Sequence, residues 1–284
     1  MKQSTASQML APVKKFLVYH CELPAFTKGD QMVEDAEEAL QNKLNRLQDG
    51  LEAMFIQVIR DEGILPSDVD AQRAIVARVL DEPFENMKET IADDSVEVAE
   101  LGRQMAFDDF RSFGIDFSST DFSEEVRDQL RNQVYEFSTD TFERIQGDFQ
   151  ETLAKGYADG KGIDDIADDL SKDFRSLRES RLALIARNEV QGAQNEGSHR
   201  TMEEYEIEYE QWLSVGDTRV RDTNEASHVD MHGEVVEVGE DFSNGLRYPG
   251  DRRGAKAEYM NCRCRARPYI PREDEHITST PYYP

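Results

Sequence analysis

The chain has 284 residues, of which 38% are hydrophobic and 32% are charged. This length is sufficient for one large or two ordinary domains, each with a sizeable core. No stretch approaches the roughly 18 consecutive apolar residues that a membrane helix needs. The start of the chain, residues 1–18, lacks the apolar core of a secretory signal. The composition therefore predicts a polar protein that is neither membrane-spanning nor exported by the ordinary route.

The charge balance is strongly acidic, with 59 acidic residues against 33 basic ones and a formal net charge of −26. A charge of this size makes the folded state repel itself, and salt at about 1 M screens such repulsion within about 3 Å. We therefore expect a halophilic protein from a salt-rich cytoplasm, such as that of haloarchaea. The alternative is an ordinary acidic protein with a solvated surface. The acidity also argues against sequence-independent binding to nucleic acid, because such binding requires neutralisation of phosphates.

The first half of the chain has the pattern of a helical domain. Residues 1–30 combine prolines, a glycine and a short apolar stretch, and we interpret them as an N-terminal arm. From Met32 onward, apolar residues recur at the three-and-four spacing of one helix face until Gly63 and Pro66 interrupt it. We assign residues 31–174 to a helical domain.

Further helices are expected along this domain. Residues 71–80 predict a helix that stops before Pro83, because proline disfavours the helical conformation of the residue before it. Helical spacing continues over residues 87–110. Asp121 and Glu124 have the spacing of a capping-box variant, and the helix that follows should run for close to thirty residues.

The pattern changes in the last third of the chain. Residues 163–170 predict a short helix and residues 177–193 a final strong one. The β-branched group Val235, Val236 and Val238 lies between glycines and predicts a short strand. We therefore expect an α+β fold, in which a mainly helical N-terminal half with long helices precedes a small α+β module over residues 175–272. Residues 273–284 have little to bury and form a C-terminal tail.

Two histidines and two cysteines of the module suggest a metal site. His228 and His232 precede the pair Cys262 and Cys264 by about thirty residues. Imidazole and thiolate ligands favour zinc, and four such ligands would close a structural site. The alternative is that the thiols are small core residues and the histidines lie at the surface. The third cysteine is Cys21; an odd number of cysteines does not make a disulfide framework, and we infer a reducing compartment.

The remaining chemistry-bearing residues give weaker signals. Between residues 245 and 272, eight basic residues stand against two acidic ones, which predicts a positive patch for DNA phosphates or an acidic partner. The alternative is that these side chains pair with the chain's own carboxylates. His199 and His276 stand alone and are expected to face solvent. Arg272 is the last of the eight basic residues, and the other seven form the predicted patch: Arg247, Arg252, Arg253, Lys256, Arg263, Arg265 and Arg267.

Several short motifs follow one another in a fixed order over roughly residues 150–267. They include Ala186-Arg187-Asn188-Glu189, Trp212, Asp217 and Arg219 two residues apart, His228 five residues before Gly233, and Asn261-Cys262-Arg263-Cys264. In this order they resemble the phage Mu F-type head morphogenesis family. The sequence departs from the family at Asn188, where threonine is usual, and at His232, where another residue type is common.

The resemblance implies a minor head protein, present in few copies in the virion, associated with the portal and exposed to the capsid interior. It implies help in head assembly and, as in some relatives, a role in DNA packaging or delivery, with the portal protein, the major capsid protein and genomic DNA as partners. It implies no catalytic activity. Together with the acidity, it points to a tailed virus of a haloarchaeon. The competing hypothesis is a zinc-dependent nuclease or hydrolase that uses His228, His232, Cys262 and Cys264, with Glu225 or Glu234 as general base.

Overall fold

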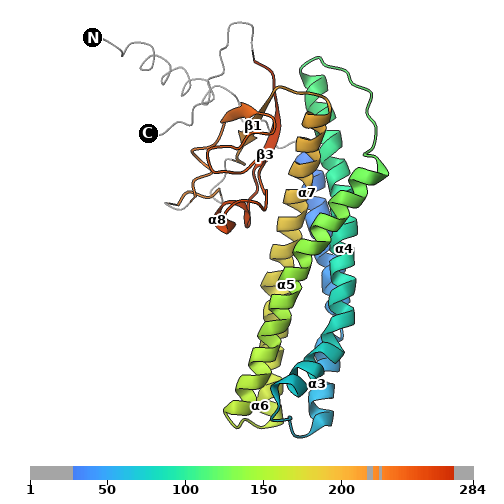
Figure 1. Cartoon of the computed structure of the whole chain (residues 1–284), viewed down its shortest axis with the longest axis vertical. Helices are drawn as coiled ribbons and strands as arrows, with labels where there is room; N and C mark the ends of the chain where they lie inside the picture. Colours follow the sequence, from blue (N-terminus) through green and yellow to red (C-terminus); the bar gives the residue numbers. More distant parts are fainter. Residues whose placement is uncertain (1–27, 216–219, 224–225, 272–284) are drawn as a thin grey trace, which may run out of the picture. The chain divides into compact units, whose positions relative to one another are not determined.

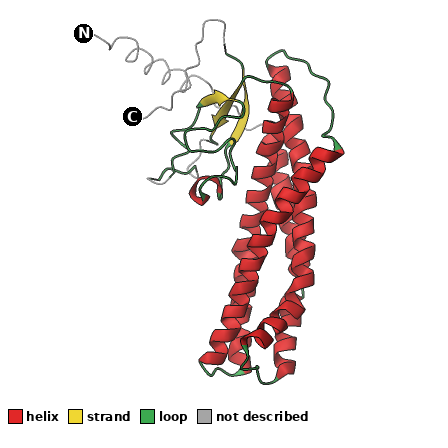
Figure 2. Cartoon of the chain, in the orientation of Figure 1, coloured by secondary structure: helices red, strands yellow, loops and turns green. Residues whose placement is uncertain are grey.

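A computed structural model describes residues 28–215, 220–223 and 226–271 of the chain (Figure 1). Its helices are α2 (Lys28–Gln48), α3 (Leu51–Glu62), α4 (Val69–Ser112), α5 (Glu124–Ala158), α6 (Ile163–Ser176), the π-helical turn η1 (Leu177–Arg181), α7 (Leu182–Glu204) and α8 (Lys256–Tyr259). Its strands are β1 (Tyr209–Leu213), β2 (Val235–Glu237) and β3 (Arg265–Tyr269). The predicted α+β class, with long helices and a small C-terminal sheet, is confirmed (Figure 2). None of the described helices is long and apolar enough to cross a membrane.

The chain divides into two compact units that are interleaved in the sequence. The first, which we call the mixed unit, groups Met1–Glu34, Ala99–Thr120 and Gln191–Pro284. The second, the helical unit, groups Asp35–Val98 and Asp121–Val190. Helices α4 and α7 therefore each contribute residues to both units.

Aromatic rings from different helices form part of the core of the helical unit. Phe55 of α3 lies 5.8 Å from Phe149 of α5 and 5.7 Å from Phe174 of α6, measured between ring centroids. On α3 the buried residues Leu51, Phe55 and Ile59 follow the four-residue spacing that places side chains on one helix face. The apolar spacing of the sequence thus serves core packing here.

Helix α4 continues through Pro83, so the predicted end of a helix before this proline is wrong. Proline lacks the N–H that would bond the carbonyl four residues earlier, a loss that normally breaks a helix. The packing of the neighbouring side chains outweighs the lost hydrogen bond here. Leu80, Phe84 and Met87 around the proline are all buried, and the ring of Phe84 lies 5.0 Å from that of Phe142 on α5.

Two further helix boundaries differ from the sequence prediction. The N-cap of α5 is Ser123, whose hydroxyl accepts a hydrogen bond from the Val126 N–H, so the predicted capping box at Asp121 and Glu124 is wrong. A serine oxygen in this position satisfies one of the N–H groups left open at a helix start. The helices expected over 163–170 and 177–193 are joined, since α6 passes through η1 directly into α7.

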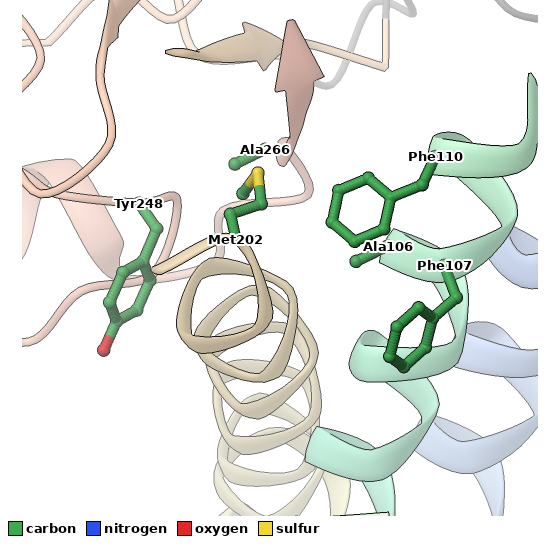
Figure 3. Packing of buried hydrophobic residues seen from close by; sticks show 6 residues of the cluster. All are labelled: Ala106, Phe107, Phe110, Met202, Tyr248 and Ala266. Atoms are coloured by element: carbon green, nitrogen blue, oxygen red, sulfur yellow. The ribbon is translucent and has the colours of Figure 1, made fainter. Parts of the chain in front are cut away.

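The sheet of the mixed unit has the order β2-β1-β3, with both pairs antiparallel. Tyr209 of β1 pairs with Glu237 on one side and Tyr269 on the other. A buried cluster joins this sheet to the ends of α4 and α7 in the same unit (Figure 3). Its members are Ala106, Phe107, Phe110, Met202, Tyr248 and Ala266.

Two glycines allow α4 and α7 to approach closely within the mixed unit. A Cβ atom added to Gly102 would lie 2.0 Å from the carbonyl oxygen of Gln194, and one added to Gly197 would lie 2.0 Å from that of Ala99. The Ser198 hydroxyl donates across the same contact to the Gly102 carbonyl oxygen at 2.8 Å. The backbones therefore meet directly, which only residues without a side chain permit.

Candidate metal centre

His228 and the two cysteines lie in short segments whose backbone conformation is fixed by local contacts. The β-bridge between Asp222 and Ser227 closes a turn, and the His228 N–H bonds the Arg221 carbonyl oxygen at 2.9 Å. The cysteines lie between α8 and β3, after Asn261, which has a φ of 58°. Asparagine tolerates this left-handed conformation better than most residues, which accounts for its place before Cys262.

His228, Cys262 and Cys264 converge in the structure. The Nδ1 atom of His228 lies 3.5 Å from the Cys262 sulfur and 3.6 Å from the Cys264 sulfur. The three candidate ligand atoms all lie within 4.8 Å of one another. All three side chains are buried, with exposed fractions of 2%, 5% and 2% in chain order.

The other ring nitrogen of His228 is held by a carboxylate. The Nε2 atom lies 3.1 Å from Oε2 of Glu258, and this oxygen also accepts a hydrogen bond from the Asn244 amide at 3.1 Å. The Trp212 ring meets the His228 ring nearly edge-on, with centroids 5.2 Å apart. In the neutral ring, a proton on Nε2 that faces this carboxylate leaves the lone pair on Nδ1, which faces the sulfurs.

The environment of the cluster favours charge on Cys262 and His228. A hydrogen bond with Cys264 lowers the pKa of Cys262 despite burial, and His228 lowers it further. Burial opposes the charged form of His228, but Cys262 and Glu258 outweigh it and raise the pKa of the imidazole. The hydrogen bond with Cys262, together with burial, raises the pKa of Cys264. Chemically, the group could hold a soft metal ion or an imidazolium–thiolate pair.

A small pocket adjoins the cluster, and its free space is about that of one water molecule. Besides the three cluster residues, its lining comprises Val215, Val220, Arg221, Asn261 and Arg263. The pocket leaves room for a small group beside the sulfurs.

His232, the fourth predicted ligand, is not brought into this cluster. Its Nδ1 atom accepts a hydrogen bond from the Ser214 N–H at 3.1 Å. Burial and the charge of Arg267 lower the pKa of His232. Of the two predicted general bases, Glu234 accepts hydrogen bonds from both the N–H and the hydroxyl of Ser243, each at 2.7 Å. Glu225 lies outside the described residues.

The arginines of the predicted positive patch largely contact acidic or polar groups of the chain itself. The guanidinium groups of Arg247 and Arg253 both bond Oδ2 of the buried Asp251, at 3.1 and 3.0 Å. Arg267 donates to Gln211 of β1 at 2.9 Å. Arg265 lies 3.9 Å from Asp30 and 3.8 Å from Asp109. Arg252 and Arg263 also have interactions within the chain, and Lys256 is exposed on α8.

His199 was expected to face solvent, and this prediction is wrong. The side chain on α7 is buried, with Nδ1 3.1 Å from Glu210 of β1 and Nε2 3.4 Å from Glu203. Burial opposes the protonated form, but hydrogen bonds to Glu203 and Glu210 raise the pKa of His199 to about 9. The helical i,i+4 spacing to Glu203 was the only sequence signal of this site. His276 lies outside the described residues.

The motif residues have mainly structural contacts. Arg187 donates to Glu37 at 2.9 Å within the helical unit, and Glu189 and Trp212 are buried. Gly233 has a φ of 84°, and its N–H bonds the Trp212 carbonyl oxygen at 2.8 Å. Asp217 and Arg219 lie outside the described residues.

Comparison with known proteins gives one family. Residues 147–267 match the family described as Phage Mu protein F like protein. No curated protein and no solved structure matches the chain. The matched segment contains the His228–Cys262–Cys264 cluster, strands β1 and β2, the first part of β3, and α6 to α8. The resemblance predicted from the sequence is therefore confirmed over residues 147–267, which are similar to phage Mu protein F.

Proposed function

We propose that the chain is a minor structural protein of a tailed-virus head, located inside the capsid beside the portal and present in few copies. The single observation that carries this proposal is the match of residues 147–267 to the Mu F-like family, whose members are virus head proteins. The proposed role is assistance in head assembly, with a further role in DNA packaging or delivery.

The contacts of the mixed unit support a structural role without catalysis. The histidine–cysteine cluster is buried, and the adjoining pocket has space only for a water-sized group. Glu234, one of the two predicted general bases, accepts hydrogen bonds from Ser243, and Glu258 beside the cluster contacts His228 and Asn244. A general base needs a free carboxylate within reach of a bound substrate.

The charge distribution favours protein partners over nucleic acid. The net charge is −26, and Arg247, Arg253 and Arg265 of the predicted positive patch contact the chain's own carboxylates. Binding to DNA gains its free energy mainly from neutralised phosphates. We therefore propose the portal protein as the main partner, and the major capsid protein and the packaged genome as secondary ones.

Quantitative mass spectrometry of purified virions tests this proposal. We expect the chain in DNA-filled heads at a copy number close to that of the portal protein and far below that of the major capsid protein. Protease treatment of intact particles should leave it uncut, and chemical cross-links should join it to the portal. Absence from full heads, or digestion in intact particles, would refute the location.

The same preparation tests the enzymatic alternative. Purified chain with added Zn²⁺ should leave double- and single-stranded DNA intact. Cleavage that His228→Ala abolishes would replace the structural assignment with a nuclease.

A further inference from the structure

We propose that His228, Cys262 and Cys264 together bind one structural Zn²⁺ ion through Nδ1 and the two sulfurs. The ion would tie the turn that carries His228 to the segment that leads into β3. This inference concerns the chain's own residues and does not depend on its place in the virion.

The separations of the ligand atoms fit a tetrahedral zinc centre. Zinc–sulfur bonds of about 2.3 Å and zinc–nitrogen bonds of about 2.0–2.1 Å, at the tetrahedral angle, place nitrogen and sulfur about 3.5 Å apart. The structure has Nδ1 at 3.5 Å from the Cys262 sulfur and at 3.6 Å from the Cys264 sulfur. Both nitrogen–sulfur separations therefore match those expected around a single zinc ion.

Hydrogen bonding between a neutral imidazole and two neutral thiols accounts poorly for this arrangement. The neutral ring of His228 has one lone pair on Nδ1, because Nε2 carries the proton that faces Glu258. Two thiols cannot both donate to this single lone pair, yet both sulfurs lie at nearly the same distance from it. A cation bound by Nδ1 and both sulfurs would account for the two nearly equal distances.

The residues around the cluster also match a zinc site. Metal-bound histidines usually donate their second N–H to a carboxylate, and Glu258 occupies that position, itself held by Asn244. The Cys264 N–H points at the Cys262 sulfur at 3.4 Å, which stabilises a thiolate there. Two thiolates and one Zn²⁺ sum to zero charge, so the group could be buried without an uncompensated ion.

The proposed site is structural although it has three protein ligands. Among the described residues the cluster contains no carboxylate that could act as a base beside the metal. The fourth position would be taken by water from the adjoining pocket. There Nη1 of Arg221 is buried without a hydrogen-bond partner, which a water molecule could supply. The ion would be bound within the fold, as in sites whose metal binding contributes to folding.

Metal analysis of the full chain tests the site directly. The reduced protein, purified from medium containing Zn²⁺, should hold one zinc per chain by elemental mass spectrometry. Replacement with Co²⁺ should give the sulfur-to-cobalt charge-transfer absorption of a thiolate-bound ion. Removal of the ion by a chelator should lower the melting temperature, and added Zn²⁺ should restore it.

Variants separate the ligands from their neighbours. Cys262→Ser, Cys264→Ser and His228→Asn should each abolish the charge-transfer band or reduce its intensity by about half or more. Glu258→Gln should keep the ion but weaken its affinity by about 10–100-fold, as for carboxylates behind a histidine ligand. The matched control is His232→Asn, because His232 lies four residues from His228 and outside the cluster; it should keep one ion.

Two results would overturn the proposal. One is a folded, fully reduced wild-type chain that binds neither Zn²⁺ nor Co²⁺. The other is a wild-type chain in which both sulfurs react with iodoacetamide equally fast with and without Zn²⁺, which would indicate an imidazolium–thiolate pair. Because both results come from the wild-type protein, misfolding of a variant cannot imitate them.

Discussion

Gly197 and Gly102 determine how closely two helices approach in the mixed unit. We expect Gly197→Ala to lower the free energy of unfolding by about 1–3 kcal/mol, the usual cost of overpacking. The reason is that the new Cβ would lie 2.0 Å from the Ala99 carbonyl oxygen, so α4 and α7 would have to separate. Denaturant unfolding at constant salt, followed by circular dichroism, measures the change.

The matched control is Gly147→Ala in α5. A Cβ at Gly147 meets nothing within 4 Å, and alanine is the better helix former by about 1 kcal/mol. This variant should therefore be neutral or more stable than wild type. Equal losses in the two variants would mean that the close contact at Gly197 is unimportant.

Protonation of His199 should stabilise the mixed unit. Its pKa in the folded chain is raised to about 9, above the ordinary value of 6.5, because Glu203 and Glu210 outweigh burial. A raised pKa contributes stability that is fully present below the unfolded pKa and lost as pH rises through the folded one. The contribution of His199 is therefore complete below about pH 6 and lost by about pH 9.

The test compares wild type with His199→Gln across this pH window. The difference in melting temperature should be large at pH 6 and should shrink as pH approaches 9.5. Three other titratable groups face the His199 ring: Glu210, whose pKa is raised by burial, the exposed Glu203, and Tyr248. The pH profiles of wild type and of His199→Gln are therefore also compared with that of Glu210→Gln. A difference that does not vary with pH would show that His199 contributes only through packing.

The histidines show what residue-level reading can and cannot predict. The sequence placed His228 with Cys262 and Cys264, and the structure brings these three together. The sequence also predicted His232 as a fourth ligand and His199 as a surface residue. In the structure, His232 bonds Ser214 and His199 is buried beside Glu210. Spacing along the chain identifies ligand types, but the partner of a polar side chain is set by which strand or helix lies opposite.

At the scale of the element, Pro83 within α4 is the clearest conflict between local preference and structure. We expect Pro83→Ala to raise the free energy of unfolding by about 1–3 kcal/mol. Alanine restores the N–H that can bond the Val79 carbonyl oxygen, while Leu80, Phe84 and Met87 keep the helix packed. Thermal and urea unfolding measure the change. A loss of stability would show that the proline ring itself contributes needed packing.

Helix positions were predictable, whereas helix ends were not. The three-and-four spacing of apolar residues indicated α3 and most of α4, α5 and α7, because that spacing is the physical requirement for burying one helix face. The expected breaks at Pro83 and between residues 170 and 177 do not occur, since α4 is continuous and α6 passes through η1 into α7. A residue that disfavours the helix, such as proline, costs a few kcal/mol of stability, and the stabilisation from packing on neighbouring helices can exceed that cost.

At the scale of the whole molecule, the net charge of −26 should make stability depend on salt. We propose that the chain is halophilic, and we expect its melting temperature to rise by several degrees between 0.02 and 2 M KCl. Screening shortens the Debye length from about 20 Å to a few ångströms over this range and so weakens self-repulsion. Differential scanning calorimetry at fixed pH measures the shift.

The concentration dependence distinguishes screening from general salting-out. Most of the increase should occur below about 0.5 M, where the Debye length changes most. A melting temperature that stays constant from 0.02 to 2 M would contradict halophily and favour an ordinary acidic protein.

The sequence by itself determined the α+β class, the order of the motifs and the resemblance to the Mu F-like family over residues 147–267, because these depend on local spacing and residue type. The tertiary structure alone decided that Ala99–Thr120, which begins in α4, belongs with Gln191–Pro284, and that Glu258 contacts the side of the His228 ring away from the cysteines. Both results depend on contacts between residues far apart in the chain. Such contacts follow from which buried surfaces fit together, as at Gly102 and Gly197, and no local period encodes that fit.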